Sequence, residues 1–163
     1  SVARLKGDEI SLRPTATTRL DFLQNIDGES DLRSEKLAYI PESYILETRL
    51  RIDAYRKVAS ASTEKEVDAL EDEMQDRFGP LPDQVISLLL ESKVRCLAEN
   101  ADFDLVETKG KELLLRYAKR GNAGERIFCR KLGHLPKLKA SKPLLKLNEI
   151  IQYLKMYIHG KNR

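Results

Sequence analysis

Histidine and cysteine side chains, which most often bind metals or act as bases and nucleophiles, are scarce in this chain. The only histidines are His134 and His159, and the only cysteines are Cys96 and Cys129. In the sequence, neither histidine lies near a nucleophile or a carboxylate constellation, and neither cysteine belongs to a CxxC or Cys/His pattern. A catalytic triad, a structural zinc site and a disulfide framework are therefore poorly supported.

Carboxylates form a more concentrated group. Glu71, Glu73 and Asp76 lie together in the segment EDEMQD. They lack the alternating oxygen-ligand spacing and the glycine of a calcium loop. On a helix they would occupy the polar side, where such residues are most often simply solvated and otherwise bind another protein.

No nucleotide-binding loop is present in the sequence. Neither GxxxxGK[ST] nor GxGxxG occurs, so no glycine-rich loop is available to hold a phosphate. We therefore expect a chain that is not an enzyme and that carries no cofactor and no metal.

The charges are segregated along the chain. Residues 60–115 contain 6 Lys and Arg against 14 Asp and Glu, whereas residues 116–163 contain 13 against 2. A small nucleic-acid-binding domain that uses residues 116–163 is therefore one hypothesis, although no RNP, KH or zinc-knuckle pattern supports it. Its candidate stacking residues are Tyr117, Phe128, Tyr153 and Tyr157.

The length of 163 residues suits one domain of ordinary size. No apolar run approaches the roughly 20 residues that span a bilayer, so we expect no membrane contact and a cytoplasmic location. The chain does not begin with Met, and the opening SVARLKGDEI lacks the apolar region of a signal peptide. These features indicate an internal or C-terminal piece of a longer protein.

Apolar spacing and capping residues predict two successive helices. The first covers residues 48–60, where apolar side chains recur at helical intervals. Thr63 and Glu66 then form a T-x-x-E capping box, so the second helix should begin at Glu64. Its expected buried stripe consists of Val67, Leu70, Met74 and Phe78.

The stretch DRFGPLP ends this helix and starts another, which should run to about Asn100. Gly79 suits a positive φ just past the helix end, and Pro80 prevents the helix from continuing. Pro82 is expected in the first turn of the next helix, where its missing N–H costs nothing. The predicted αα-corner between two antiparallel helices consists of Phe78, Gly79, Pro80, Leu81 and Pro82.

Beyond the third helix, FDLVET and ELLLRYA predict a hairpin around Lys109-Gly110-Lys111, and RIFCRKL predicts a further strand. The segment LPKLKASKPLLKL contains two prolines and is expected to be mostly loop. A C-terminal helix capped by Ser141 or Asn148 should follow, with an apolar face of Ile150, Ile151, Leu154, Tyr157 and Ile158.

These elements predict an α+β fold, with a helical core that contains the αα-corner and a small antiparallel β-sheet. Residues 1–40 have little sustained periodicity and are interpreted as an N-terminal arm or linker, in which EISLRP and TTRLDFL could be short strands. Residues 41–163 are interpreted as the domain itself.

Three motifs in succession resemble a known family. AYIPESYI, then RLRIDAYRKVASASTEKEVDALEDEMQDRFGPLP, then a Leu-rich helix together resemble the C-terminal domain of bacterial transcription-repair coupling factor (Mfd). The resemblance is strongest from Tyr39 to about Leu97, is weak over residues 8–38 and is poor after Gly121. The opening VARLKG is also similar to the segment that leads out of the family's motor, which makes residues 1–40 an arm from the motor region.

The resemblance implies a regulatory domain that lies outside the motor. In the family, this domain packs on the N-terminal UvrB-like module of the same polypeptide, covers its UvrA-binding surface and keeps the protein repressed. The parent is an ATP-driven DNA translocase that binds RNA polymerase, DNA and UvrA in transcription-coupled repair. The family's acidic contact to the basic surface of the module matches Glu73 and Asp76 in this sequence.

Overall fold

The computed structural model describes residues 15–25, 35–117, 126–127 and 137–161. The elements follow in the order β1 (Thr17–Leu20), the 3-10 helix η1 (Asp21–Leu23), β2 (Gln24–Asn25), β3 (Glu35–Lys36), α2 (Thr48–Ser60), α3 (Glu64–Phe78), α4 (Asp83–Asn100), β4 (Phe103–Lys109), β5 (Glu112–Tyr117), β6 (Arg126–Ile127) and α5 (Pro143–Lys161). Among the described residues, no helix combines the length and the hydropathy needed to cross a bilayer.

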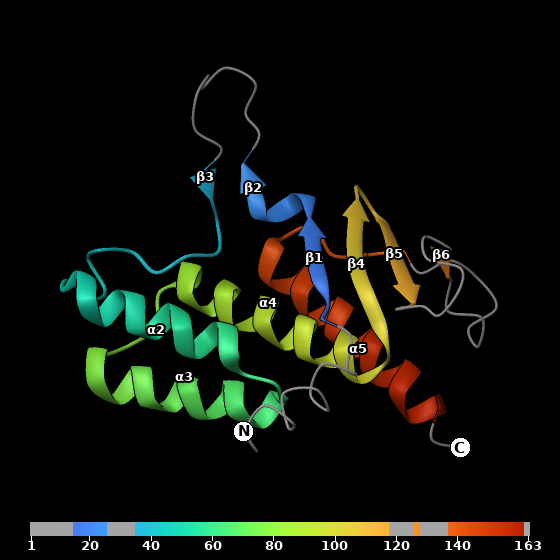
Figure 1. Ribbon diagram of the computed structural model, residues 1–163. Helices are drawn as coiled ribbons and strands as arrows, with labels where there is room; N and C mark the ends of the chain where they lie inside the picture. Colours follow the sequence, from blue (N-terminus) through green and yellow to red (C-terminus); the bar gives the residue numbers. More distant parts are fainter. Residues whose placement is uncertain (1–14, 26–34, 118–125, 128–136, 162–163) are drawn as a thin grey trace, which may run out of the picture.

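One sheet and four α-helices make up most of the described structure (Figure 1). The sheet has the strand order β1-β4-β5-β6, and β2 pairs separately with β3. The pairs β4/β5 and β5/β6 are antiparallel, whereas β1 is parallel to β4. The predicted α+β class is confirmed, and the parallel β1 makes the small sheet mixed rather than wholly antiparallel.

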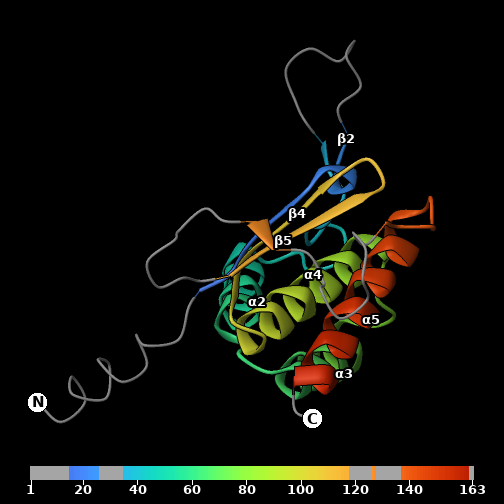
Figure 2. The ribbon, with the colours of Figure 1, turned by 90° about the vertical axis from the view of Figure 1, so that its right-hand side faces the viewer.

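Helix α4 is the centre of the molecule because it is buried on two sides. Figure 2 shows the sheet as one layer above α4 and α5, with α3 farthest from the sheet. Val94, Leu97 and Ala98 of α4 belong to a core shared with the sheet and α5. Val85, Leu89 and Cys96 of α4 belong to a second core shared with α2 and α3.

The predicted bounds of α2, α3 and α4 agree with the structure, apart from the position of Pro82. This residue is the N-cap of α4, with φ −72° and ψ 162°, and the helix begins at Asp83. The proline ring fixes φ but leaves ψ free, so the same residue can stand just before a helix as well as in its first turn.

The C-terminal helix starts one residue later than a Ser141 cap predicts and well before the start that an Asn148 cap predicts. It begins at Pro143, within the segment expected to be loop, because a proline is tolerated at the first helical position. Asn148 lies inside the helix and donates from Nδ2 to the Leu144 carbonyl at 3.1 Å, so it is not the cap. Of the predicted strand RIFCRKL, only Arg126–Ile127 lies within the described residues, where it forms β6.

The described part of residues 1–40 is integrated into the fold. Ala16, Leu20 and Leu23 are buried in the core formed with the sheet and α5. The Asp21 carboxylate accepts hydrogen bonds from the Thr108 hydroxyl at 2.7 Å and from the Gly110 N–H at 2.8 Å, which ties η1 to the predicted β4/β5 hairpin. The segment interpreted as an arm therefore includes a strand of the main sheet, while residues 1–14 lie outside the described part.

Candidate docking surface

The end of α3 has a backbone conformation that requires glycine. Gly79 has φ 92° and ψ −171°, and its N–H donates to the Gln75 carbonyl at 3.0 Å. The positive φ agrees with the sequence prediction, but ψ lies far from the left-handed helical value and in a region that only glycine occupies readily. A Cβ at Gly79 would have no neighbouring atom within 4 Å, so the restriction comes from the backbone itself.

Tyr44 holds this corner from the side. Its hydroxyl lies 3.1 Å from the Met74 carbonyl oxygen and 2.9 Å from the Gly79 carbonyl oxygen, so one phenolic donor serves the last turn of α3 and the residue after it. The ring of Tyr44 meets the ring of Phe78 edge-on, with centroids 5.9 Å apart. Burial raises the pKa of Tyr44.

Phe78 and Leu81 are half-buried and pack against the core shared by α2, α3 and α4. Their position agrees with the predicted role of filling the space between the helices. The Arg77 guanidinium lies 5.0 Å from the centroid of the Phe78 ring and covers part of it. The corner is therefore packed on its inner side and charged on its outer side.

Asp76 and Glu73 differ in their surroundings, although both lie on α3. Asp76 is exposed, and within the described part of the chain it forms no ion pair. The Glu73 side chain is 39% exposed, and its Oε2 lies 2.8 Å from Lys57 Nζ of α2 and 3.2 Å from Arg77 NH1. Of the two predicted docking carboxylates, Asp76 is therefore exposed without an ion pair among the described residues, whereas Glu73 contacts two cations.

These contacts change the titration of Glu73 and Lys57. The hydrogen bond from Lys57 is the main cause that lowers the pKa of Glu73, and the hydrogen bond from Arg77 adds to it. The same bond to Glu73 is the main cause that raises the pKa of Lys57. Glu73 therefore stays ionised to a lower pH than an unperturbed glutamate.

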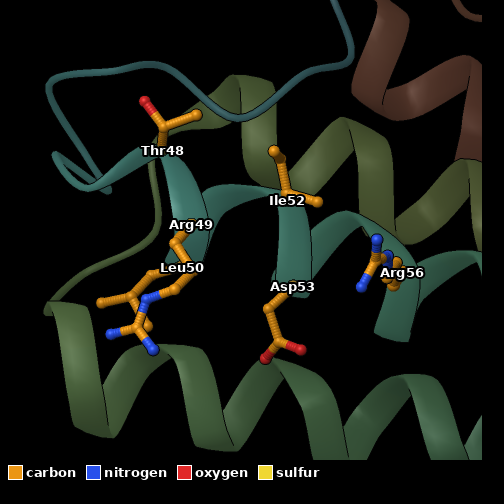
Figure 3. A pocket seen from close by; sticks show the side chains of 6 residues that line it. All are labelled: Thr48, Arg49, Leu50, Ile52, Asp53 and Arg56. Carbon is orange, nitrogen blue, oxygen red and sulfur yellow. The ribbon is translucent and has the colours of Figure 1, made fainter.

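Helix α2 forms the other side of this surface. Figure 3 shows Leu50 and Asp53 pointing from α2 toward α3, whereas Ile52 points away from α3. Asp53 Oδ2 lies 3.6 Å from Lys57 Nζ, so Lys57 lies between a carboxylate of its own helix and Glu73 of the next. The candidate docking surface therefore consists of Asp53, Lys57, Glu73, Asp76 and Arg77.

Sequence reasoning missed Tyr44, Lys57 and Arg77 as partners of this surface. The pairs Asp53/Lys57 and Glu73/Arg77 have i,i+4 spacing, which predicts contact along each helix. The Lys57–Glu73 pair joins two helices and depends on how they pack, so no local spacing could reveal it.

A protein-family model described as the TRCF domain matches residues 35–126, which include the Tyr44 segment, α2, α3, the corner and α4. This chain belongs to the TRCF-domain family. The resemblance to transcription-repair coupling factor seen in the sequence is therefore confirmed, and the Tyr44 hydroxyl connects two of the motifs that carried it.

Individual relatives agree with the family assignment. This chain is 28% identical over 153 residues to a transcription-repair-coupling factor of Rickettsia prowazekii. The match covers 92% of this chain and 12% of that protein. The chain is 31% identical over 131 residues to one of Bacillus subtilis, covering 78% of this chain and 10% of that protein. The chain thus spans about a tenth of the length of the curated relatives that it matches.

A solved structure shares the fold. The crystal structure of the C-terminal domain of transcription-repair coupling factor superposes with a TM-score of 0.56, at 22% identity, covering 89% of this chain and 98% of that chain. The α+β arrangement of the TRCF domain is therefore a known fold.

The basic C-terminal third offers fewer stacking residues than the sequence suggested. Tyr157 is only 8% exposed and packs against Phe103 at a centroid distance of 4.9 Å, so it belongs to the core. Tyr153 is half-buried, and its hydroxyl donates to the Lys137 carbonyl at 3.3 Å. Phe128 and the side chain of Tyr117 lie outside the described part of the chain.

The remaining reactive side chains of the TRCF domain have ordinary surroundings. Cys96 is buried, its Sγ lies 3.4 Å from the Ala61 carbonyl oxygen, and burial raises the pKa of the thiol. His159 is exposed, whereas His134 and Cys129 lie outside the described residues. Within the described ranges, no three His, Cys, Asp or Glu side chains gather as a metal site.

Proposed function

We propose that this TRCF domain docks on an N-terminal UvrB-like module of the same polypeptide and masks the UvrA-binding surface of that module. In this way it would autoinhibit a parent ATP-driven DNA translocase of transcription-coupled nucleotide excision repair. The domain itself is then a regulatory part without catalysis. RNA polymerase, DNA and UvrA are the partners of the parent, and the cytoplasm is its compartment.

The observation that carries this proposal is the position of the matched acidic residues. Asp76 and Glu73 lie three residues apart on α3, so they occupy neighbouring positions on its surface. Val67 and Met74 of the same helix are buried, at 0% and 3% exposure, so the carboxylates can meet a partner without disturbing the core. The docking surface has three carboxylates against two cations, Lys57 and Arg77, so its net charge is negative and complements a basic surface.

The corner supports the proposal because it fixes the end of α3 in space. Tyr44 binds the last turn of the helix and the residue after it, and Phe78 anchors the inner side. A charged pair on a rigid helix end can recognise a partner with little loss of conformational entropy. The motifs that resemble the family thus position the residues proposed to dock.

Competition tests the proposal. The isolated UvrB-like module is mixed with UvrA, and this chain is added in trans at increasing concentration. We expect the chain to reduce UvrA binding in a saturable way, and the E73K/D76K variant to compete much less. Equal competition by the two folded chains would show that this acidic surface does not mask the UvrA site.

Nucleic-acid binding by the basic third is a second candidate function, supported by exposed lysines at 137, 139 and 142. Other lysines there already have intramolecular neighbours, since Lys155 Nζ lies 2.9 Å from Glu64 and Lys146 Nζ lies 5.1 Å from the ring centroid of Phe22. Phosphate binding would weaken steeply with salt, with a slope near −0.9 per phosphate neutralised on duplex DNA. Titration of a DNA duplex with this chain at several salt concentrations tests this candidate.

A further inference from the structure

We propose that Lys57 is an internal competitor at the docking surface, occupying Glu73 where a Lys or Arg side chain of the partner's basic surface would bind. The proposal rests on the docking function above and adds a residue that sets its strength. A domain without this lysine would dock more tightly.

The geometry of the pair carries the inference. Lys57 Nζ lies 2.8 Å from Glu73 Oε2, which is the spacing of a charge-assisted hydrogen bond. The side chains are 40% and 39% exposed, so the pair lies at the surface and can open without unfolding a core. A partner cation that binds Glu73 must share it with Lys57 or displace it.

The space around the pair limits how a partner cation can approach Glu73. Lys57 and Glu73 line a narrow crevice between α2 and α3 with a volume of about 10 Å³, which is room for one water molecule. Its apolar wall includes Leu50, Leu70 and Phe78. The crevice has no room for a further Lys or Arg side chain, so a partner cation meets Glu73 at the exposed surface, where it shares the carboxylate with Lys57 or displaces Lys57.

The charges identify the kind of group that replaces Lys57. Asp53 and Glu73 supply two carboxylates at the crevice, and the cations that contact them are Lys57 and Arg77. With Lys57 removed, the local charge becomes more negative while the hydrogen-bond acceptors remain. The complementary occupant is therefore a cationic side chain of the UvrB-like module.

The test compares affinities of this chain for the isolated UvrB-like module at one salt concentration. We expect K57M to bind about two- to fivefold more tightly, because Glu73 is freed from one exposed ion pair. K57R keeps the charge and should bind like the unmodified chain. K93M is the matched control, since Lys93 joins α4 to Asp68 of α3 at 2.6 Å without contacting Glu73.

A double variant shows whether Lys57 acts through Glu73. In the E73Q background, K57M should bring no further gain, because the carboxylate for which the two cations compete is absent. If K57M is not fully folded by circular dichroism, K57Q replaces it and is judged by the same criterion.

The outcomes separate this inference from the docking function. If E73K/D76K weakens binding while K57M binds equally or more weakly than the unmodified chain, Lys57 is a structural tie between the helices and the inference is wrong. If E73K/D76K leaves binding unchanged, the docking function itself is wrong. A gain from K57M that persists with E73Q would also contradict competition at Glu73.

Discussion

The Tyr44 hydroxyl lies 2.9 Å from the Gly79 carbonyl oxygen and thereby joins the YIPESYI segment to the DRFGPLP corner. The same hydroxyl reaches the Met74 carbonyl, in the last turn of α3. The Gly79 carbonyl lies just past the helix, where no intrahelical partner is available, so the Tyr44 donor stabilises the end of the helix there. The YIPESYI and DRFGPLP motifs, which lie apart in the sequence, are thus in direct contact at the end of α3.

Removal of this hydroxyl should destabilise the domain. We expect Tyr44→Phe to lower the free energy of unfolding by about 1 kcal/mol, the usual net value of one hydrogen bond. Urea denaturation followed by circular dichroism measures the change. Tyr39→Phe, at a tyrosine that is 37% exposed, is the control and should have little effect. Equal losses of unfolding free energy in the two variants would show that the hydrogen bonds of the Tyr44 hydroxyl do not stabilise the domain.

Substitution of Gly79 should be costly whatever the new side chain. We expect Gly79→Ala and Gly79→Asn each to lose at least about 1 kcal/mol, because φ 92° with ψ −171° is outside the left-handed helical region that asparagine tolerates. Gly110, with φ 60°, is the comparison, and there asparagine should cost less than alanine. Relief of the Gly79 penalty by asparagine would contradict this backbone assignment.

Removal of the half-buried Phe78 ring should lower the free energy of unfolding less than removal of a fully buried ring would. Complete burial would predict a loss of about 3–5 kcal/mol for Phe78→Ala, whereas a partly exposed ring should lose roughly 1–3 kcal/mol. The edge-on contact with Tyr44 should make the Phe78→Ala and Tyr44→Ala losses non-additive. A double-mutant cycle by chemical denaturation measures this coupling, and strict additivity would argue against the contact.

Lowering the pH should remove the contribution of ionised Glu73 to the free energy of unfolding. Its pKa in the folded chain lies below the ordinary 4.5, mainly through Lys57, so ionised Glu73 stabilises the fold above that pH. The contribution is lost as the pH falls through the lowered value. The difference in unfolding free energy between the unmodified chain and E73Q should therefore be largest near neutral pH and shrink below about pH 4. A difference independent of pH would contradict the ion pair.

Local signals in the sequence were sufficient to predict most helix ends. The Thr63 hydroxyl accepts from the Glu66 N–H at 3.1 Å, as the capping box requires. The Glu66 carboxylate accepts from the Ser62 N–H at 2.6 Å, and the backbone of Ser62 and, to a smaller extent, that of Thr63 lower its pKa. Gly79 and Gly110 both have positive φ at predicted turns. These features depend on neighbours in sequence, which explains why they were predictable.

Tertiary packing decided what the sequence could not predict. The parallel pairing of Thr17 with Leu105 in β1 and β4 joins distant segments, and nothing in either segment specifies that partner. The burial of Tyr157 against Phe103 depends likewise on how α5 meets the sheet. At the docking surface, the acidic side of α3 was predictable from its own pattern. One of the two cations that bind Glu73, Lys57, comes from α2, so this pair could be found only after the two helices were placed together.

The affinity of this chain for the UvrB-like module, measured by titration calorimetry, tests the central claim most directly. Asp76→Lys is compared with Glu112→Lys, a reversal of another exposed carboxylate, on β5, with E73K/D76K as the stronger variant. Like charges brought together across a desolvated interface can cost several kcal/mol. We therefore expect Asp76→Lys to weaken docking at least about tenfold, E73K/D76K to abolish it, and Glu112→Lys to leave it unchanged. Unchanged affinity for E73K/D76K, in a chain that circular dichroism shows to be folded, would mean that this acidic surface is merely solvated and would contradict the proposed docking.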